Sequence, residues 1–140
     1  RALRRRDAEP QVSPDRLFLL LGALSGMISV LAGALGAHLL KAQLAAGMLE
    51  IFETAVRYQM FHALALVVVA WAVGRFEGRS APLAGVLFVL GSVLFCGSLY
   101  AYSLSGLRAF TMGAPFGGAA LAAGWACLAW TALAAQRRSH

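Results

Sequence analysis

The sequence has little charge and no asparagine. Only 13% of its 140 residues are Asp, Glu, Lys or Arg, whereas 60% are hydrophobic. Soluble domains carry about twice that charged fraction, so the composition argues against an ordinary soluble domain and favours a chain surrounded by lipid. Without asparagine, the sequence also has no acceptor for N-glycosylation.

Motifs for catalysis and cofactor binding are missing as well. The sequence contains no GxSxG, no Walker loop, no GxGxxG and no CxxC, and each of these supplies a specific nucleophile, phosphate cradle or metal-ligand spacing. We therefore expect no enzyme activity, no catalytic residue and no cofactor.

The positive charge lies mainly at the two ends of the sequence. The net charge is +6, with Arg1, Arg4, Arg5 and Arg6 at one end and Arg137 and Arg138 at the other. Such clusters beside apolar segments set membrane topology or contact lipid headgroups. We expect a basic flexible tail over residues 1–16, a second basic tail over 136–140, membrane lipids as partners and no nucleic-acid partner.

Four apolar segments between these tails are each long enough to cross a membrane, which takes about 20 helical residues. Ser13 and Pro14 indicate a helix start, and the sequence predicts spans over about 17–40, 54–74, 82–104 and 115–135. The second span reaches this length only if Arg57, Gln59 and His62 belong to it. An interfacial helical segment starting near Ala46 is expected to lead into it. The predicted fold is thus an all-α membrane protein, a bundle of four transmembrane helices.

The distribution of lysine and arginine predicts the orientation of this bundle. The termini and the second loop hold Arg1, Arg4, Arg5, Arg6, Arg16, Arg75, Arg79, Arg137 and Arg138, whereas the first and third loops hold only Lys41, Arg57 and Arg108. Basic residues accumulate on the cytoplasmic side. Both termini are therefore predicted to be cytoplasmic.

Glycines are frequent in the predicted spans, and small residues let membrane helices approach closely. The predicted packing positions are Gly22, Gly26, Gly33, Gly36, Gly91, Gly97, Gly113, Gly117 and Gly124. A homodimer face is the alternative role for them. The two cysteines, Cys96 and Cys127, lie at depths of about 21 and about 12 Å from the same membrane face, so no disulfide is expected.

Polar residues gather toward the predicted outer half of the bundle. This polar cluster consists of His38, Glu53, Arg57, Tyr58, Gln59, His62 and Tyr100. At 100° per residue, Glu53 and Arg57 are close enough for an ion pair, whereas His62 is half a turn from Glu53 and shares a face with Gln59. One helix therefore cannot bring Glu53 and His62 to the same metal ion, and no metal site is expected.

Several stretches resemble a known family: GALGAHLLK, FETAVRYQMFHALAL, LGSVLFCGSLYAYSLSG and APFGGAALAAGWACLAW. They resemble the YgdD-like family of small four-span bacterial inner-membrane proteins, whose eukaryotic relatives are mitochondrial. The resemblance covers about residues 17–135 and implies a bacterial inner-membrane location. It marks the residues of the polar cluster as signature positions without giving them a role. The chain departs from the family pattern at Leu39, where the family has glycine, and this change predicts a first helix that continues regularly.

Three functions are compatible with these patterns. The leading hypothesis is a non-catalytic accessory or stabilising subunit of a larger membrane complex, which implies other membrane subunits or self-association as partners. The first alternative is a small oligomeric transporter or channel with the polar cluster as its vestibule. The second is a protein that binds a lipid or quinone in the same outer cleft.

Overall fold

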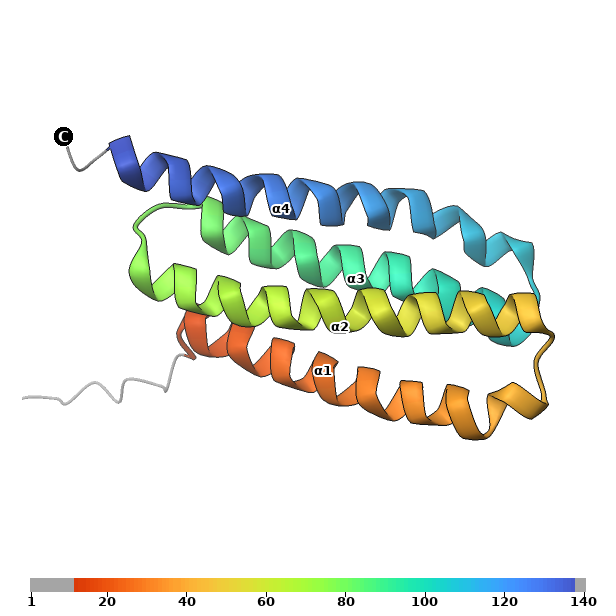
Figure 1. The fold of residues 1–140 in the computed structure, drawn as a ribbon. Helices are drawn as coiled ribbons and strands as arrows, with labels where there is room; N and C mark the ends of the chain where they lie inside the picture. Colours follow the sequence, from red (N-terminus) through yellow and green to blue (C-terminus); the bar gives the residue numbers. More distant parts are fainter. Residues whose placement is uncertain (1–11, 138–140) are drawn as a thin grey trace, which may run out of the picture.

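The computed structural model describes residues 12–137, and within this range all regular structure is helical. Four long helices run antiparallel in chain order: α1 (Pro14–His38), α2 (Ala46–Arg75), α3 (Ser80–Ser105) and α4 (Gly113–Arg137) (Figure 1). Short 3-10 helices, η1 (Leu40–Ala42) and η2 (Arg108–Met112), lie in the first and third loops. Each of the four α-helices is long and apolar enough to cross a membrane.

Local signals explain where these helices begin and end. Pro14 occupies the first turn of α1, although the Ser13 side chain makes no capping hydrogen bond. Gly106 ends α3 with a φ of 72°, a conformation that glycine adopts without steric cost. The prediction of a regular continuation at Leu39 was wrong, because α1 ends at His38 and the chain then tightens into η1.

Helix α2 is the longest element and contains the residues that the sequence assigned to the second span. Its 30 residues correspond to about 45 Å, more than the roughly 30 Å of a bilayer core. The helix is continuous from Ala46 onward, so the segment before residue 54 belongs to the same helix as Arg57, Gln59 and His62.

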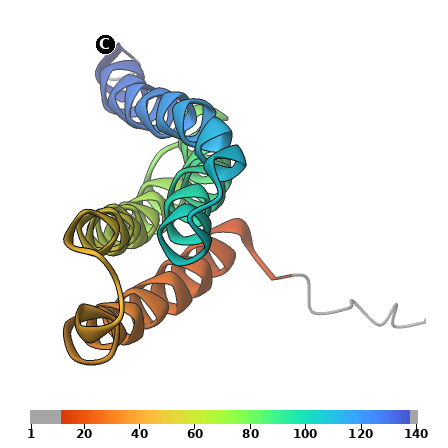
Figure 2. The same ribbon diagram turned by 90° about the vertical axis from the view of Figure 1, so that its right-hand side faces the viewer.

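The helices form an open row. Figure 2 shows α1 and α4 at opposite ends, with α2 and α3 between them. The core lies mainly along the α2–α3–α4 seam, where Val69 and Phe88 are both fully buried. Helix α1 packs mainly on α2, and it reaches α3 through the Phe18 ring, which covers Gly85. Much of the outer surface of α1 and α4 is apolar and uncovered, as lipid-facing surface is.

The predicted packing glycines lie against neighbouring helices, with one exception. At each of the others, a heavy atom of an adjacent helix lies within 4 Å of the position that a Cβ would occupy. Gly22 and Gly26 face Ala63 of α2, so this GxxxG pair packs within the chain. The prediction that Gly97 packs against another helix was wrong, because nothing lies within 4 Å of the position that its Cβ would occupy. Both cysteines are free.

Candidate functional site

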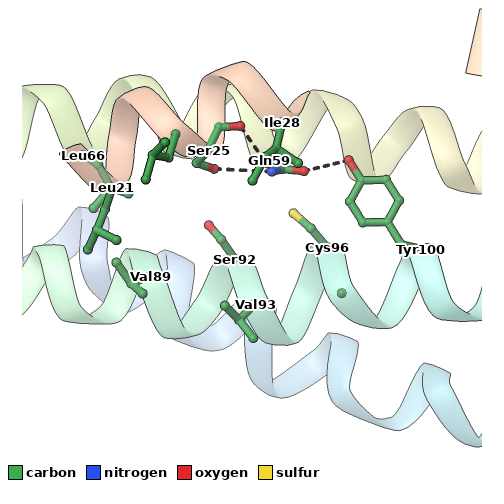
Figure 3. Close-up of a pocket in the computed structure, with 12 residues that line it drawn as sticks. Leu21, Ser25, Ile28, Gln59, Leu66, Val89, Ser92, Val93, Cys96 and Tyr100 are labelled. Atoms are coloured by element: carbon green, nitrogen blue, oxygen red, sulfur yellow. Dashed lines mark hydrogen bonds between the residues drawn. The ribbon is translucent and has the colours of Figure 1, made fainter. Parts of the chain in front are cut away.

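A hydrogen-bond network centred on Gln59 joins three helices. The Gln59 side-chain amide donates to the backbone oxygen of Ser25 on α1 at 3.2 Å, and Tyr100 of α3 donates its hydroxyl to Gln59 Oε1 at 2.8 Å. Figure 3 shows this bridge from Ser25 through Gln59 to Tyr100. The Gln59 side chain is only 9% exposed. Because a buried amide without partners is costly, the network explains how α2 accommodates a polar residue here.

Close contact between α1 and α2 places Gln59 beside Ser25. Gly22 allows this contact because it has no side chain: the carbonyl oxygen of Ala63 lies only 2.8 Å from the position that a Cβ of residue 22 would occupy. One helical turn beyond Ser25, the buried Ser29 hydroxyl donates to the backbone oxygen of Val56 at 2.8 Å. Small residues on α1 thus allow the approach, and serine hydroxyls fix it.

His62 belongs to a second arrangement, which faces α3 and α4. Its Nδ1 lies 2.7 Å from the Tyr58 carbonyl oxygen, and its Nε2 lies 3.3 Å from Nε1 of Trp125. A carbonyl oxygen only accepts and an indole N–H only donates, so these partners assign the neutral tautomer with the proton on Nδ1. The Phe88 ring contacts both the imidazole and the indole, at centroid distances of 5.5 and 5.1 Å. His62 and Phe88 are buried in this arrangement, whereas Trp125 is half exposed.

A pocket of about 530 Å³ opens between α1, α2 and α3, and we call it the central pocket. Figure 3 shows its lining, with the Ser92 and Cys96 side chains of α3 directed toward the Gln59 network. The lining residues are Leu21, Leu24, Ser25, Ile28, Gln59, Leu66, Val89, Ser92, Val93, Cys96, Gly97 and Tyr100. Gly97, which the sequence predicted to pack, thus lies at the pocket.

The Ser92 hydroxyl is the unusual polar group of the central pocket. Its oxygen is buried and has no hydrogen-bond partner among the described residues. A serine in a helix often donates its hydroxyl to a backbone carbonyl about one turn earlier. Ser103, for example, donates to the backbone oxygen of Tyr100 at 3.0 Å. Ser92 lines the pocket, and its hydroxyl is a buried donor and acceptor in the pocket wall without a protein partner among the described residues.

Three members of the polar cluster, one histidine and two charged residues, lie away from the central pocket. His38, Glu53 and Arg57 are all exposed. Glu53 and Arg57 line a separate hollow of about 310 Å³ between α1 and α2, together with Gly33, Gly36, Phe52 and Val56. We call this the charged groove. The possible Glu53–Arg57 ion pair is not formed, although the helical spacing permits it. Within residues 12–137, no group of three or more His, Cys, Asp or Glu is placed to hold a metal ion.

The structure therefore divides the predicted polar cluster into parts. Gln59 and Tyr100 meet in the central pocket, and Tyr58 stacks on His62 with ring centroids 6.2 Å apart. Sequence reasoning did not single out Ser25 and Trp125, the partners of Gln59 and His62. It also missed the buried hydroxyls of Ser29 and Ser92. A signal existed for the two serines of α1, because Ser25 and Ser29 are four residues apart, as Gly22 and Gly26 are. Nothing in the sequence distinguishes Ser92 from other serines of α3.

Comparisons with known proteins give the family. The profile of a family described as "Protein of unknown function (DUF423)" matches residues 32–118. A UPF0382 membrane protein of Staphylococcus haemolyticus is 41% identical over 113 residues, covering 81% of this chain and 92% of the relative. The UPF0382 inner membrane protein YgdD of Escherichia coli K12 is 38% identical over 124 residues, covering 89% and 95%. The UPF0382 membrane protein YwdK of Bacillus subtilis is 38% identical over 111 residues, covering 79% and 90%.

No solved structure matches the chain. The relatives are similar over nearly their whole length, and their printed names agree with the four membrane-spanning helices. This chain is an integral membrane protein and belongs to the DUF423 family, whose members carry the name UPF0382.

Proposed function

We propose that this protein is a non-enzymatic membrane protein that binds a small lipid-soluble molecule with a neutral head group in the central pocket. The observation that carries the proposal is the buried, unpartnered Ser92 hydroxyl in a pocket of about 530 Å³. Ligand pockets are commonly apolar with a few placed polar groups. The central pocket has that composition, with the Gln59 network at one side.

The uncharged lining favours a neutral head group. None of the lining residues is charged, and an ion inside the membrane without a partner is costly. Ser92 lies near the middle of α3, about 18 Å along the helix from Ser80. Charged phospholipid headgroups stay at the membrane surface, so a molecule whose polar group enters this depth has to be neutral. A carbonyl oxygen, as in a quinone, would accept a hydrogen bond from the Ser92 hydroxyl.

Binding of a benzoquinone with a decyl tail to the purified full chain in detergent micelles tests this proposal. We expect saturable binding, weakened about three- to tenfold in Ser92→Ala by the loss of one hydrogen bond. Ser98→Ala is the matched control, because Ser98 lies on the same helix but faces Gly113 of α4. Equal affinities of the wild type and Ser92→Ala would contradict the proposal. Equally tight binding of the C10 fatty acid at pH 8 would contradict the neutral head group.

A second candidate is the role of an accessory subunit, and the open row of helices favours it. Leu31 on α1 is 63% exposed and Phe116 on α4 is 72% exposed, so each terminal helix presents an apolar face to lipid or to another membrane protein. Copurification at native abundance after mild detergent extraction tests this role. A defined partner in constant ratio supports it, whereas a solitary chain argues against it.

We propose further that the protein lies in the bacterial inner membrane with both termini in the cytoplasm. The location rests on the name of the Escherichia coli relative. The orientation is supported by Arg16, Arg75 and Arg79 at one end of the helix row, opposite Lys41 and Arg108. A reporter that is active only in the cytoplasm, fused to the C-terminus, should be active, and a periplasmic reporter should not.

A further inference from the structure

The charged groove lies on the seam between α1 and α2 and is separate from the central pocket, with no lining residue in common. Its α1 side consists of Gly33 and Gly36. A Cβ added at Gly36 would lie 3.2 Å from the Phe52 ring, and one at Gly33 would lie 3.4 Å from Val56. The groove therefore depends on two residues without side chains.

Two opposite charges border this groove without pairing. Glu53 and Arg57 are one helical turn apart on α2, about 6 Å along the axis. Both are exposed and both line the groove, but neither forms an ion pair with any described residue. A carboxylate and a guanidinium are thus available, side by side, to one ligand that carries both signs of charge.

The depth of the groove in the membrane follows from the length of α2. Arg57 is 18 residues from Arg75, or about 27 Å, and Glu53 is 22 residues away, or about 33 Å. A hydrocarbon core of about 30 Å that begins at Arg75 therefore ends between Arg57 and Glu53. Arginine extends toward the surface from such a position. Both charged groups then lie at the level of the phospholipid headgroups.

We propose that the charged groove binds the headgroup of a zwitterionic phospholipid whose amine can donate hydrogen bonds, as in phosphatidylethanolamine. The Arg57 guanidinium pairs with the phosphate, since guanidinium and phosphate form strong bidentate hydrogen bonds. The Glu53 carboxylate accepts hydrogen bonds from the ammonium group. An anionic lipid would satisfy Arg57 but would place negative charge beside Glu53. A choline headgroup carries the positive charge but has no N–H to donate.

Native mass spectrometry of the full chain in mild detergent tests this site. The protein is offered equal amounts of phosphatidylethanolamine, phosphatidylglycerol and phosphatidylcholine with the same acyl chains. We expect phosphatidylethanolamine to be retained preferentially. Glu53→Gln should lower the preference for phosphatidylethanolamine over phosphatidylglycerol about tenfold, and Arg57→Gln should weaken the binding of both about tenfold, because charge-assisted hydrogen bonds are lost.

Glu50→Gln is the matched control, because Glu50 is an exposed glutamate on the same helix that does not line the groove. It should keep the wild-type preference. An unchanged preference in Glu53→Gln would overturn the proposal, as would tighter binding of phosphatidylglycerol than of phosphatidylethanolamine by the wild type. Equal retention of phosphatidylcholine and phosphatidylethanolamine would refute the requirement for an amine donor. Ser92→Ala should leave all these ratios unchanged, so this site and the central pocket are tested separately.

Discussion

The substitution of alanine at Gly22 and at Gly97 measures how closely α1 approaches α2. Both glycines lie inside long helices, where alanine is more favourable than glycine by about 1 kcal/mol. At Gly97 nothing lies within 4 Å of the added Cβ, so only this gain applies. Gly97→Ala is therefore expected to stabilise the protein by up to about 1 kcal/mol.

Gly22→Ala adds a steric cost to the same gain. Its Cβ would lie 2.8 Å from the Ala63 carbonyl oxygen and 3.2 Å from both Leu66 Cβ and Val67 Cγ2. A backbone oxygen cannot rotate away, so the helices have to separate. Overpacking of this kind costs about 1–3 kcal/mol. After subtraction of the helix gain, Gly22→Ala should destabilise the protein by about 0–2 kcal/mol.

The two variants should thus differ by about 1–3 kcal/mol in their free energies of unfolding. Unfolding by increasing fractions of sodium dodecyl sulfate in mixed micelles, followed by circular dichroism, gives this difference. Val67→Ala in the Gly22→Ala background should restore only part of the stability, because the Ala63 oxygen remains. If Gly22→Ala proves as stable as Gly97→Ala, α1 and α2 do not make this close contact.

Two further substitutions test the buried hydrogen bonds. Tyr100→Phe removes the donor to Gln59 Oε1 but keeps the ring that packs edge-on against Phe52; we expect a loss of about 0.6–1.7 kcal/mol, and a double-mutant cycle with Gln59→Leu should assign most of it to the pair. Trp125→Phe removes the N–H at 3.3 Å from His62 Nε2. It should cost about 0.6 kcal/mol and shift the ¹⁵N resonance of that imidazole nitrogen, and an unchanged resonance would contradict the assigned tautomer.

The presence of four long helices could be predicted because their signals are local. Pro14 and Pro82 fall in first turns, and Gly106 ends α3 in a left-handed conformation. The second span was less obvious, since its purely apolar run is short. The length needed to cross a membrane recruited Arg57, Gln59 and His62, and α2 contains all three.

The contacts between helices could not be predicted in the same way. The sequence shows that Gly91 and Gly97 are both small residues of α3. The rotation of α3 relative to its neighbours then decides that Gly91 packs against Leu121 while Gly97 borders the central pocket. The spacing of Glu53 and Arg57 allows an ion pair. Exposed pairs of this kind contribute little free energy, about 0–1 kcal/mol, against the entropy of two long side chains, so spacing alone does not determine whether they form.

The cost of desolvation explains why the polar residues of α2 divide into two groups. Gln59 and His62 are neutral and buried, and each has protein partners for its hydrogen-bonding groups. Glu53 and Arg57 are charged and exposed, in the part of α2 that extends to the membrane surface. A neutral side chain needs only hydrogen bonds to tolerate burial, whereas a charge also needs a counter-charge. The same reasoning assigns a neutral head group to the central pocket and a zwitterionic one to the charged groove.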